Sequence, residues 1–542
     1  GDQDGAQGAG EVVDGIQPKG MTEMMMYRAL LQGAGLLVVL AVAACGGGGG
    51  DSPAAPPAPS TPVAPEQPNP PLTPAPPSAP PPPPVTPVPV VTDRIEALDT
   101  GLPRLAPQMS ATAVARRTGG PVATPVNLGP LPNAQGFEKK ATERAALAKG
   151  APQQIGVARP VAATARPRDM LGQLQWQAVG GGLQRAAVSF KAEGAHGVRL
   201  GVLVRNLPAG TVLRFYAQAG GDAVQITGEE VLRTIQRNLD AGDKGDAART
   251  YWGPDFGGAE TTLELQVPVA ARLEELDIAV PTLSHFFVSP DQATAASFAK
   301  VGESGSCNID VSCKAELNAE SRAVARMIFV QEGGSYLCTG TLLNDISSSR
   351  IPYFLSAHHC ISTQTVASTL TTDWFYRSTS CNTASANPGA QKVTGGAALL
   401  FADSQTDTSF MRLNSAPPQG VVYAGSYFGQ VTQSSPVLGI HHPRGDLQKT
   451  SAGSVEAFSY CSNEQCFPST QQDGRYYSVG WVSGTTEGGS SGSGLFSTID
   501  AKRYVVGQLY GGASSCQAPT GRDFYGRFDL PFQLAIKTWL TP

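Results

Sequence analysis

The stretch YFLSAHHC at residues 353–360 is the segment from which the fold of this chain can be argued. It opens as an apolar run of strand length and ends in two histidines and a cysteine. This pattern predicts a strand that places the imidazole of His359 at its end. Cys360 can tie the turn to Cys338 on the preceding predicted strand, and such a disulfide would hold the imidazole in one position, as a general base requires.

Two further segments supply what a base needs for nucleophilic catalysis. DTSFMRL (407–413) begins a strand with an acid, and EGGSSGSG (487–494) is a glycine-rich turn around a serine. A hydroxyl is a poor nucleophile at neutral pH, so it requires a base, a group that orients the base and donors for the oxyanion. Glycines allow such a turn to bring successive backbone N–H groups toward one point.

The three candidate residues follow the order His359, Asp407 and Ser491, with separations of 48 and 84 residues. This is the chymotrypsin order, whereas the subtilisin and α/β-hydrolase types run differently. Each segment alone carries little weight, because a Gly/Ser turn is usually only a turn. Together they predict a serine hydrolase with these residues as its catalytic triad.

The chain resembles the bacterial lysyl endopeptidases, a chymotrypsin-like family. The resemblance covers about 240 residues and rests on SGSCNIDV (304–311), YFLSAHHC (353–360), IHHP (440–443), GSSGS (489–493), GQLYGG (507–512) and YGR (525–527). It implies an all-β fold, with a chymotrypsin-like double β-barrel protease domain and a C-terminal helix, preceded by a β-rich propeptide domain.

The resemblance also implies roles for individual residues. His359 would be the general base, Asp407 its orienting carboxylate and Ser491 the nucleophile, with oxyanion donors from the backbone of Gly489 and Ser491. Gly511 and Gly512 match the segment that pairs with the substrate backbone as an added strand. The disulfides that it implies are Cys307 with Cys516, Cys313 with Cys381 and Cys338 with Cys360, which leaves Cys461 to pair with Cys466.

Asp523 is the residue that would set the specificity. In the family an aspartate at this place contacts the substrate lysine, and a carboxylate facing a cation discriminates against neutral and acidic side chains. The alternative is a surface aspartate paired with Arg522. Tyr510 stands where the family has histidine and Phe458 where a tryptophan lines the pocket, so the sequence supports a basic residue more firmly than lysine over arginine.

Composition divides the 542 residues into four segments. Residues 21–45 are predicted to be a lipoprotein signal peptide, because a basic residue precedes an apolar run too short to span a membrane and the run ends at Cys45, the expected lipidation site. An ordinary signal peptide that ends at a cysteine is the alternative. Residues 46–92 form a Gly/Pro-rich linker, in which 19 of the 44 prolines lie between Pro53 and Pro89. Residues 93–300 are the expected propeptide and 301–542 the protease domain.

Periodicity gives a coarse view of these parts. Alternation with a period of two indicates strands of a small β domain from about Val198 to Val288, whereas residues 91–190 show no clear pattern. Short strands with Gly, Ser and Asn turns follow from Ser304 and predict a barrel or sandwich. After Pro531, apolar residues at helical spacing predict a closing helix that packs against the outside of a barrel.

The propeptide is expected to assist folding and to be removed by a cut after Lys300. Trypsin-like enzymes carry an aspartate just before the nucleophile, which receives a new N-terminal ammonium on activation. Ser490 occupies that position here, so maturation must control activity differently. The cut would leave the lipid anchor on the propeptide and release the protease domain.

Charge and cysteine content narrow the partners and the compartment. A net charge of −5 with 15% charged residues provides no basic stripe for nucleic acid. Eight of the nine cysteines lie between Cys307 and Cys516, which indicates up to four disulfides in an exported protein. The paired histidines at 358–359 and 441–442 would point to opposite faces of a strand, so no metal or other cofactor is expected.

These features predict a monomeric, exported lipoprotein precursor at the bacterial outer membrane or cell surface, which acts on protein or peptide substrates. It would touch a membrane only through a lipid at Cys45. Two alternatives remain open at this point: a catalytically inactive surface binding protein that keeps the protease fold, and an enzyme of this fold with another primary specificity, such as glutamate, which Asp523 disfavours.

Overall fold

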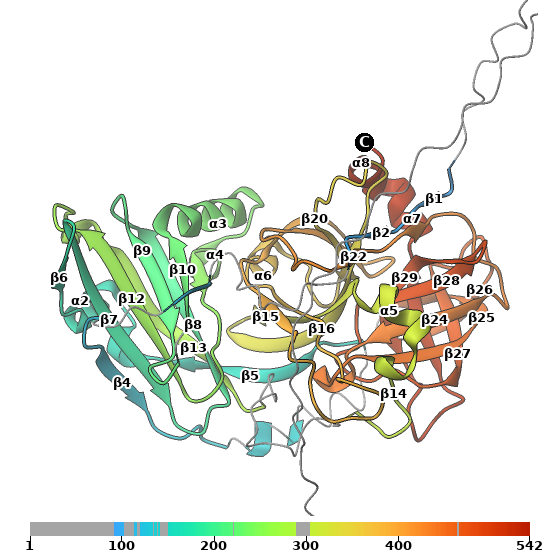
Figure 1. Ribbon diagram of the computed structural model, residues 1–542, viewed down its shortest axis with the longest axis horizontal. Coiled ribbons are helices and arrows are strands. Elements are labelled where there is room, and N and C mark those ends of the chain that lie inside the picture. Colours follow the sequence, from blue (N-terminus) through green and yellow to red (C-terminus); the bar gives the residue numbers. More distant parts are fainter. Residues whose placement is uncertain are drawn as a thin grey trace, which may run out of the picture. The chain divides into compact units, whose positions relative to one another are not determined.

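Three large β-sheets form the framework of the computed structural model (Figure 1), which describes residues 92–101, 113–115, 120–133, 135–137, 139–140, 150–220, 222–288, 304–462 and 465–542. All of these residues belong to one compact unit, Pro87–Pro542. The predicted signal peptide, Cys45, nearly all of the linker and Lys300 lie outside the described residues. The all-β class expected from the sequence is confirmed.

The C-terminal part of the chain forms a closed barrel. Each of six strands pairs with the next, and the last returns to the first, which closes the ring. Apolar residues of these strands, such as Val455, Val479 and Leu495, fill its interior. In order around the ring the strands are β24 (Pro436–His441), β25 (Lys449–Ser462), β27 (Tyr476–Ser483), β30 (Arg522–Arg527), β29 (Lys502–Gly512) and β28 (Gly494–Ile499), and β14 (Ile309–Asp310) and β26 (Gln465–Ser469) pair with β25.

A second set of antiparallel strands, which we call the first barrel, precedes the C-terminal barrel in the chain. It encloses its own core, which contains Met327, Phe354, Trp374 and Met411. Strand β17 lies between β16 and β21, so the segment that ends in His359 is held on both sides. The strands are β15 (Val324–Gln331), β16 (Gly334–Leu343), β17 (Tyr353–Ala357), β18 (Thr371–Trp374), β19 (Gln391–Val393), β20 (Ala397–Asp403) and β21 (Thr408–Leu413).

Residues 93–300, the expected propeptide and hereafter the propeptide region, contain a two-layer β sandwich, which we call the sandwich. Residues from both layers, among them Val188, Val198 and Leu213, share one apolar core. One layer contains β3 (Ala113–Ala115), β10 (Asp222–Thr227), β9 (Val212–Tyr216), β12 (Glu260–Pro268), β7 (Leu183–Ala192), β4 (Thr124–Leu128) and β6 (Gln177–Gly180). The other contains β11 (Thr250–Trp252), β8 (Gly197–Asn206), β13 (Asp277–Phe286) and β5 (Gln153–Pro160).

Strands β4 to β7 lie in the stretch 91–190, where the sequence shows no clear pattern. The reason is visible in β7, in which four successive residues, Arg185 to Val188, are all buried. A strand covered on both faces does not alternate between apolar and polar residues, so its period of two disappears from the sequence.

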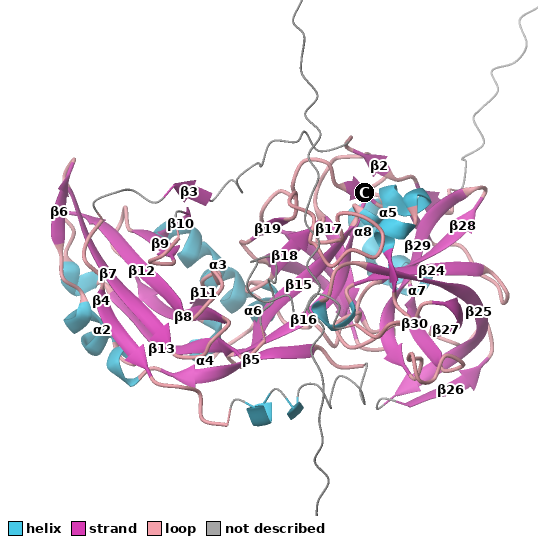
Figure 2. Cartoon of the chain, turned by 60° about the horizontal axis from the view of Figure 1, so that its bottom comes forward, coloured by secondary structure: helices cyan, strands magenta, loops and turns pink. Residues whose placement is uncertain are grey.

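Two parts of the propeptide region join the protease strands directly. Strand β5 pairs with β13 on one side and with β16 on the other, so one sheet of 11 strands runs from the sandwich into the first barrel (Figure 2). Further upstream, β1 (Arg94–Ile95) pairs with β23 (Ser426–Tyr427), and β2 (Leu98–Asp99) pairs with β22 (Val422–Tyr423). We call residues 92–101 the strap.

The helices are short apart from α3 (Gly228–Asp240), whose first turn is closed by a capping box between Thr227 and Glu230. The closing helix is present as α7 (Asp529–Pro531), a π-helical turn (Phe532–Ile536) and α8 (Lys537–Leu540), and it buries Phe532, Ile536 and Leu540 in a cluster that includes residues of both barrels. The remaining helices are α2 (Pro167–Gln173), α4 (Gly245–Ala248), α5 (Asn318–Ser321) and α6 (Gln364–Ala367).

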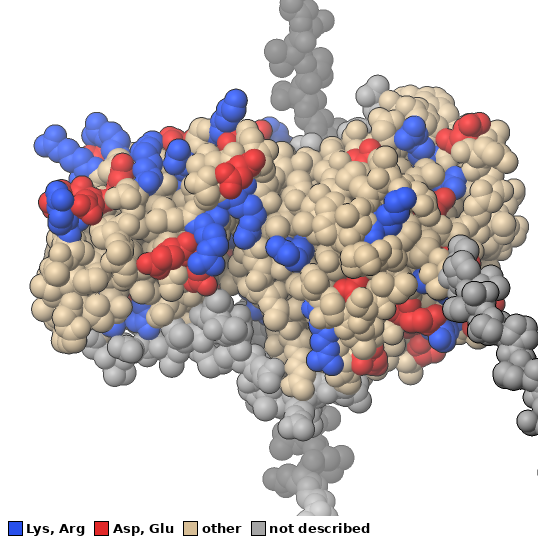
Figure 3. All heavy atoms as spheres, turned by 90° about the horizontal axis from the view of Figure 1, so that it is seen from above, with Lys and Arg blue, Asp and Glu red and all other residues tan. Residues whose placement is uncertain are grey.

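None of the helices in the described part of the chain has the length and apolar character needed to cross a membrane. On the face drawn in Figure 3, acidic and basic side chains lie interspersed among a majority of uncharged residues.

Candidate active site

His359 and Asp407 come together at the ends of neighbouring strands. The Asp407 carboxylate accepts the backbone N–H of His359 at 2.9 Å and lies 2.7 Å from its ring Nδ1. Asp407 is buried and has a positive φ of 53°, and its carbonyl accepts from the backbone N–H of His358. A carboxylate fixed in this way favours the tautomer in which Nδ1 carries the proton, which leaves Nε2 as the basic atom.

The turn around Ser491 is tied to strand β16 through Thr339. The N–H of Thr339 donates to the carbonyl of Ser491 at 2.8 Å, and its hydroxyl donates to the carbonyl of Gly489 at 2.9 Å. Gly489 has a φ of 91°, and a Cβ there would lie 3.0 Å from the carbonyl oxygen of His442. Only glycine fits this backbone without strain, so the sequence of the turn is set by its close approach to a neighbouring loop.

Ser490 is held by an interaction that the sequence did not indicate. Its hydroxyl lies 2.9 Å from Nδ1 of His441, and the backbone N–H of Glu487 donates to the same hydroxyl at 3.2 Å. Both Ser490 and His441 are fully buried. Ser490 is therefore fixed by a hydroxyl–imidazole contact, at the position where trypsin-like enzymes have an aspartate.

Ser491 and the ring Nε2 of His359 are covered in this structure. Ser491 has 0% exposure, and the buried Nε2 of His359 has no hydrogen-bond partner within the described ranges. A Cβ placed on Gly150 of the propeptide region would lie 3.8 Å from the Tyr510 ring, which itself packs edge-on against His359. Three residues further along the chain, Gln153 of β5 is paired with Leu337 of β16.

Asp523 is a buried carboxylate on β30, not a surface residue paired with Arg522, which instead forms an ion pair with Glu456. Its Oδ2 accepts hydrogen bonds from Trp481 Nε1 at 2.7 Å, the Thr486 hydroxyl at 2.7 Å and the Ser514 hydroxyl at 2.5 Å. These three donors are uncharged, so they orient the carboxylate without neutralising it.

Of the other residues expected around the substrate, some lie beside Asp523 and one lies in the core of the barrel. Gly511 and Gly512 pair with Phe524 and Asp523, which places this segment of β29 directly beside the carboxylate. Phe458 lies in the core of the C-terminal barrel, where its ring contacts Tyr477 and the guanidinium of Arg527. Trp481, Thr486 and Ser514 were not identified from the sequence, because no local pattern separates them from ordinary strand and turn residues.

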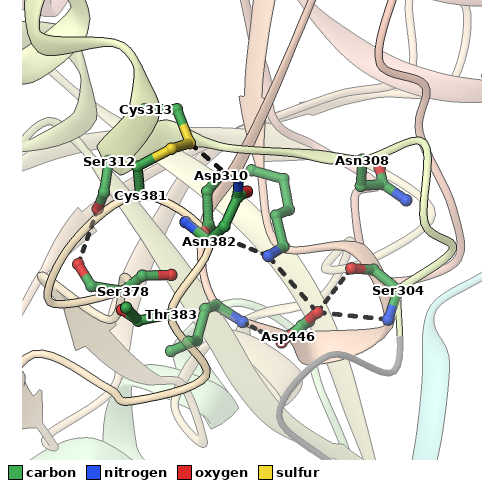
Figure 4. A network of polar contacts seen from close by, with 12 residues as sticks. Ser304, Asn308, Asp310, Ser312, Cys313, Ser378, Cys381, Asn382, Thr383 and Asp446 are labelled. Atoms are coloured by element: carbon green, nitrogen blue, oxygen red, sulfur yellow. Dashed lines mark hydrogen bonds and ion pairs between the residues drawn. A yellow bond between two sulfur atoms is a disulfide. The ribbon is translucent and has the colours of Figure 1, made fainter.

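The first described residues of the protease region are also tied to the loops around the site (Figure 4). The hydroxyl of Ser304 donates to Asp446 at 2.6 Å, and Lys449 pairs with Asp310 at 2.7 Å. One residue further, the N–H of Gly305 donates to Glu487 at 2.8 Å, at the start of the turn that contains Ser491. The start of the protease region is therefore tied both to Asp446 and to the turn that contains Ser491.

Four disulfides fix the described cysteines, and they join the pairs that the resemblance implies. The bond between Cys338 and Cys360 anchors the residue next to His359 to β16, and the bond between Cys307 and Cys516 holds the segment next to Gly305.

Two observations bear on metal binding. Cys338, His359 and Cys360 lie close together, but their sulfurs are joined to each other and supply no thiolate ligand. His442 is fully buried, with Nδ1 3.0 Å from the carbonyl of Asp446, and burial lowers its pKa to about 3. It therefore stays neutral and serves as a structural residue.

Comparisons with known proteins agree with this geometry. Residues 301–526 match the family model for the lysyl endopeptidase C-terminal domain, and residues 127–287 match that for the lysyl endopeptidase N-terminal domain. The chain is 34% identical over 398 residues to a lysyl endopeptidase of Pseudomonas aeruginosa. The alignment covers 70% of this chain and 79% of that protein.

Two solved structures are also similar to part of the chain. The MamO protease domain of Magnetospirillum magneticum has a TM-score of 0.28 and 10% identity, with 40% of this chain and 97% of that one covered. The thermostable serine protease AL20 from an extremophilic microorganism has a TM-score of 0.29 and 14% identity, with 41% and 99% covered.

Proposed function

The chain belongs to the lysyl endopeptidase family of serine endopeptidases, and we propose that it cleaves protein chains after basic residues, with lysine preferred, by a Ser–His–Asp acyl-enzyme mechanism. The observation that carries the mechanism is the pair of contacts from the buried Asp407 to His359, beside the turn that contains Ser491. Family membership makes the chain an enzyme, in preference to the inactive binding protein that the sequence left open.

In the proposed reaction, the Ser491 hydroxyl attacks the scissile carbonyl while His359 Nε2 takes its proton. The oxyanion that forms accepts hydrogen bonds from the backbone N–H groups of Gly489 and Ser491. When the C–N bond breaks, His359 returns the proton to the leaving amine. Water then hydrolyses the acyl-enzyme by the same route, and Asp407 keeps the imidazole oriented throughout.

Asp523 supports the proposed preference for a basic residue. A substrate ammonium that reaches this carboxylate would supply the charge that Trp481, Thr486 and Ser514 do not. A glutamate side chain would instead bring a second negative charge next to a buried one, which is strongly unfavourable. Primary specificity for glutamate is therefore disfavoured.

The test is cleavage of matched peptides that differ only in having Lys, Arg, Glu or Leu before the scissile bond. We expect cleavage after Lys and Arg, and none of it in Ser491→Ala. Asp523→Asn should lower kcat/KM for the Lys peptide by about a hundredfold or more. Glu456→Gln, which removes the nearby carboxylate that pairs with Arg522, is the matched control and should keep the preference. Processed, folded protein that cleaves none of the peptides would refute the proposal.

The proposal includes synthesis as a zymogen. Strand β5 adds to β16, and Gly150, just before it, lies against Tyr510, next to the Gly511–Gly512 segment where an extended substrate would pair as an extra strand. Since Ser491 is fully buried in the uncut chain, substrate access requires this part of the sandwich to move. The expected cut after Lys300 would begin that separation, and N-terminal sequencing of the mature enzyme tests its position.

Export and membrane attachment complete the proposal. The predicted signal peptide, the disulfides and the family membership support an enzyme that acts outside the cytoplasm, with Cys45 as the site of lipid attachment and a monomeric protease domain. Mass spectrometry of the N-terminal peptide tests the lipid, because an unmodified Cys45 in the exported protein would refute it.

A further inference from the structure

The strap is built into the protease region rather than into the sandwich. Its two short strands pair with β23 and β22, and β23 in turn pairs with β29 of the C-terminal barrel. Backbone contacts continue at both ends, since the N–H of Phe428 donates to the carbonyl of Asp93 at 2.9 Å and the Thr100 hydroxyl donates to the carbonyl of Val421 at 2.6 Å. The strap is therefore held along its length.

Ile95 anchors the strap in the hydrophobic core. It is 2% exposed and belongs to the cluster that contains residues of both barrels and of the closing helix, such as Leu343, Phe496 and Phe532. Loss of the strap would leave a cavity in this cluster, and cavities in a packed core are costly.

Gly425 indicates that the protease region is shaped around the strap. A Cβ on Gly425 would lie 2.6 Å from the carbonyl oxygen of Ile95 and 2.9 Å from the N–H nitrogen of Ala97. The strap backbone therefore occupies the space that a side chain at this position would need.

Charged contacts surround the same segment. The Arg322 guanidinium, with its side chain 5% exposed, forms an ion pair with Asp99 and also donates to the carbonyls of Gly101 and Gly420. Glu96 accepts from Lys502 at 2.7 Å and from the Tyr504 hydroxyl at 2.8 Å. Without the strap, Arg322 would be a largely buried cation that has lost its carboxylate, which is a strongly unfavourable state.

We propose that the strap is a permanent part of the protease, which stays bound without a covalent link after the chain is cut on both sides of the sandwich, between the strap and β3 and after Lys300, and the sandwich leaves. The mature enzyme would then consist of two chains, the fragment that ends in the strap and the protease fragment that begins after the cut. If Cys45 carries a lipid, the strap and linker would keep the active enzyme attached to the membrane instead of releasing it. Retention does not depend on catalysis, so it can be tested apart from the proposed function.

The experiment uses the full chain with Ser491→Ala, so that no cut depends on its own activity. Recognition sequences for an unrelated, sequence-specific protease are inserted within residues 102–112 and 289–303, and an affinity tag is inserted within the proline-rich tract 53–89. After both cuts, the tagged fragment is immobilised and the sandwich fragment is removed by washing in mild denaturant. We expect the protease fragment to remain on the resin. Elution of a folded protease fragment together with the sandwich would overturn the proposal.

Two variants sharpen the test. Gly425→Ala should release the protease fragment at least about tenfold faster, because the added Cβ displaces the strap backbone. Asp99→Arg should also accelerate release, and combining it with Arg322→Asp should restore retention at least in part. Thr92→Ala, at an exposed position of the strap, is the matched control and should change nothing.

If Gly425→Ala fails to fold, which unfolding of the uncut chain would reveal, the charge exchange decides the question alone. Unchanged release in Asp99→Arg, or no recovery in the exchanged pair, would count against the strap as the retaining element. Loss of peptide cleavage by the wild-type enzyme would refute the proposed function but leave this result unaffected.

Discussion

The two contacts between the propeptide region and the protease strands differ in what they bury. At the sandwich, β5 adds to one end of β16 and contributes Ile155 to a small cluster with Ile328 and Leu337. At the strap, Ile95 enters the main cluster that the two barrels share. Removing β5 takes one residue from a small cluster, whereas removing the strap leaves a cavity in the large cluster that includes residues of both barrels. We therefore expect the contact at β5 to open and the contact at the strap to persist.

Each of the two contacts also contains a buried arginine, and the two arginines differ in their partners. Arg199 of the sandwich is fully buried and donates to the carbonyls of Gly253 and Thr369, its Nη1 has no partner within the described ranges, and burial lowers its pKa to about 10. Arg322 of the protease region instead forms an ion pair with Asp99 of the strap. Among the described residues, Arg199 forms no ion pair as close as that of Arg322 with Asp99, and its burial carries a desolvation cost that separation of the sandwich relieves.

The largest expected effect comes from a variant that abolishes the enzyme's own activity and so prevents the expected cut after Lys300, on which separation of the sandwich depends. Asp407→Asn should lower kcat by about ten-thousandfold, because the amide no longer stabilises the protonated His359 in the required orientation. Both contacts should then persist in an uncut chain, as judged by gel electrophoresis and peptide assays. Asp473→Asn, at an exposed turn position before β27, is the control and should process normally. Retention of a tenth of the activity would refute the role of Asp407.

The second prediction opens the sandwich contact alone. In a chain made uncuttable at the expected site by Lys300→Gln, Ile155→Asp should raise peptide cleavage by at least about tenfold, because a buried carboxylate destabilises the packing of β5 on β16. Val179→Asp, at an exposed apolar position of the sandwich, is the control. An equally inactive Ile155→Asp chain, with its sandwich shown to be detached, would mean that β5 does not restrict the site.

The third prediction compares the two anchors after processing. Ile95→Ala should lower the free energy of unfolding of the processed enzyme by about 2–4 kcal/mol, because it opens a cavity in the shared core. Ile155→Ala should leave that value unchanged, since its residue departs with the sandwich. Denaturant unfolding followed by tryptophan fluorescence measures both. Equal effects of the two variants would erase the proposed difference between the contacts.

The smallest expected effect is a pH dependence of strap retention. The hydrogen bond from Arg322 lowers the pKa of Asp99 from its ordinary value of 3.8. The ionised form therefore stabilises the contact above that value, and this contribution is lost as the pH falls through the lowered pKa. Because the Asp99 side chain is 50% exposed, we expect only a severalfold faster release at about pH 3 than at pH 6.

Glu96 shares this dependence, since the hydrogen bond from Lys502 lowers its pKa as well. Release rates of Asp99→Asn measured across the same range separate the two carboxylates. A release rate that does not change with pH in the unmodified chain would show that neither ion pair contributes to retention.

Parts of the active site follow from local sequence and parts do not. His359, Asp407 and Ser491 could be proposed because each sits at a recognisable strand end or glycine-rich turn. Trp481, Thr486 and Ser514 could not be identified, because their contact with Asp523 exists only when β27, β29 and β30 lie side by side in the closed barrel. The hydroxyl–imidazole contact between Ser490 and His441 was missed for the same reason.

The sequence by itself determined the all-β class, the family, and the order of the residues proposed for catalysis, because these depend on periodicity and on short motifs that keep their meaning out of context. Only the tertiary structure decided that Asp523 is buried, that β5 lies beside the nucleophile turn and that the strap belongs to the protease. These facts depend on pairing between residues hundreds of positions apart, such as Arg94 with Tyr427. No local pattern in the strap predicts that pairing, because its partner strands lie more than 300 residues further along the sequence.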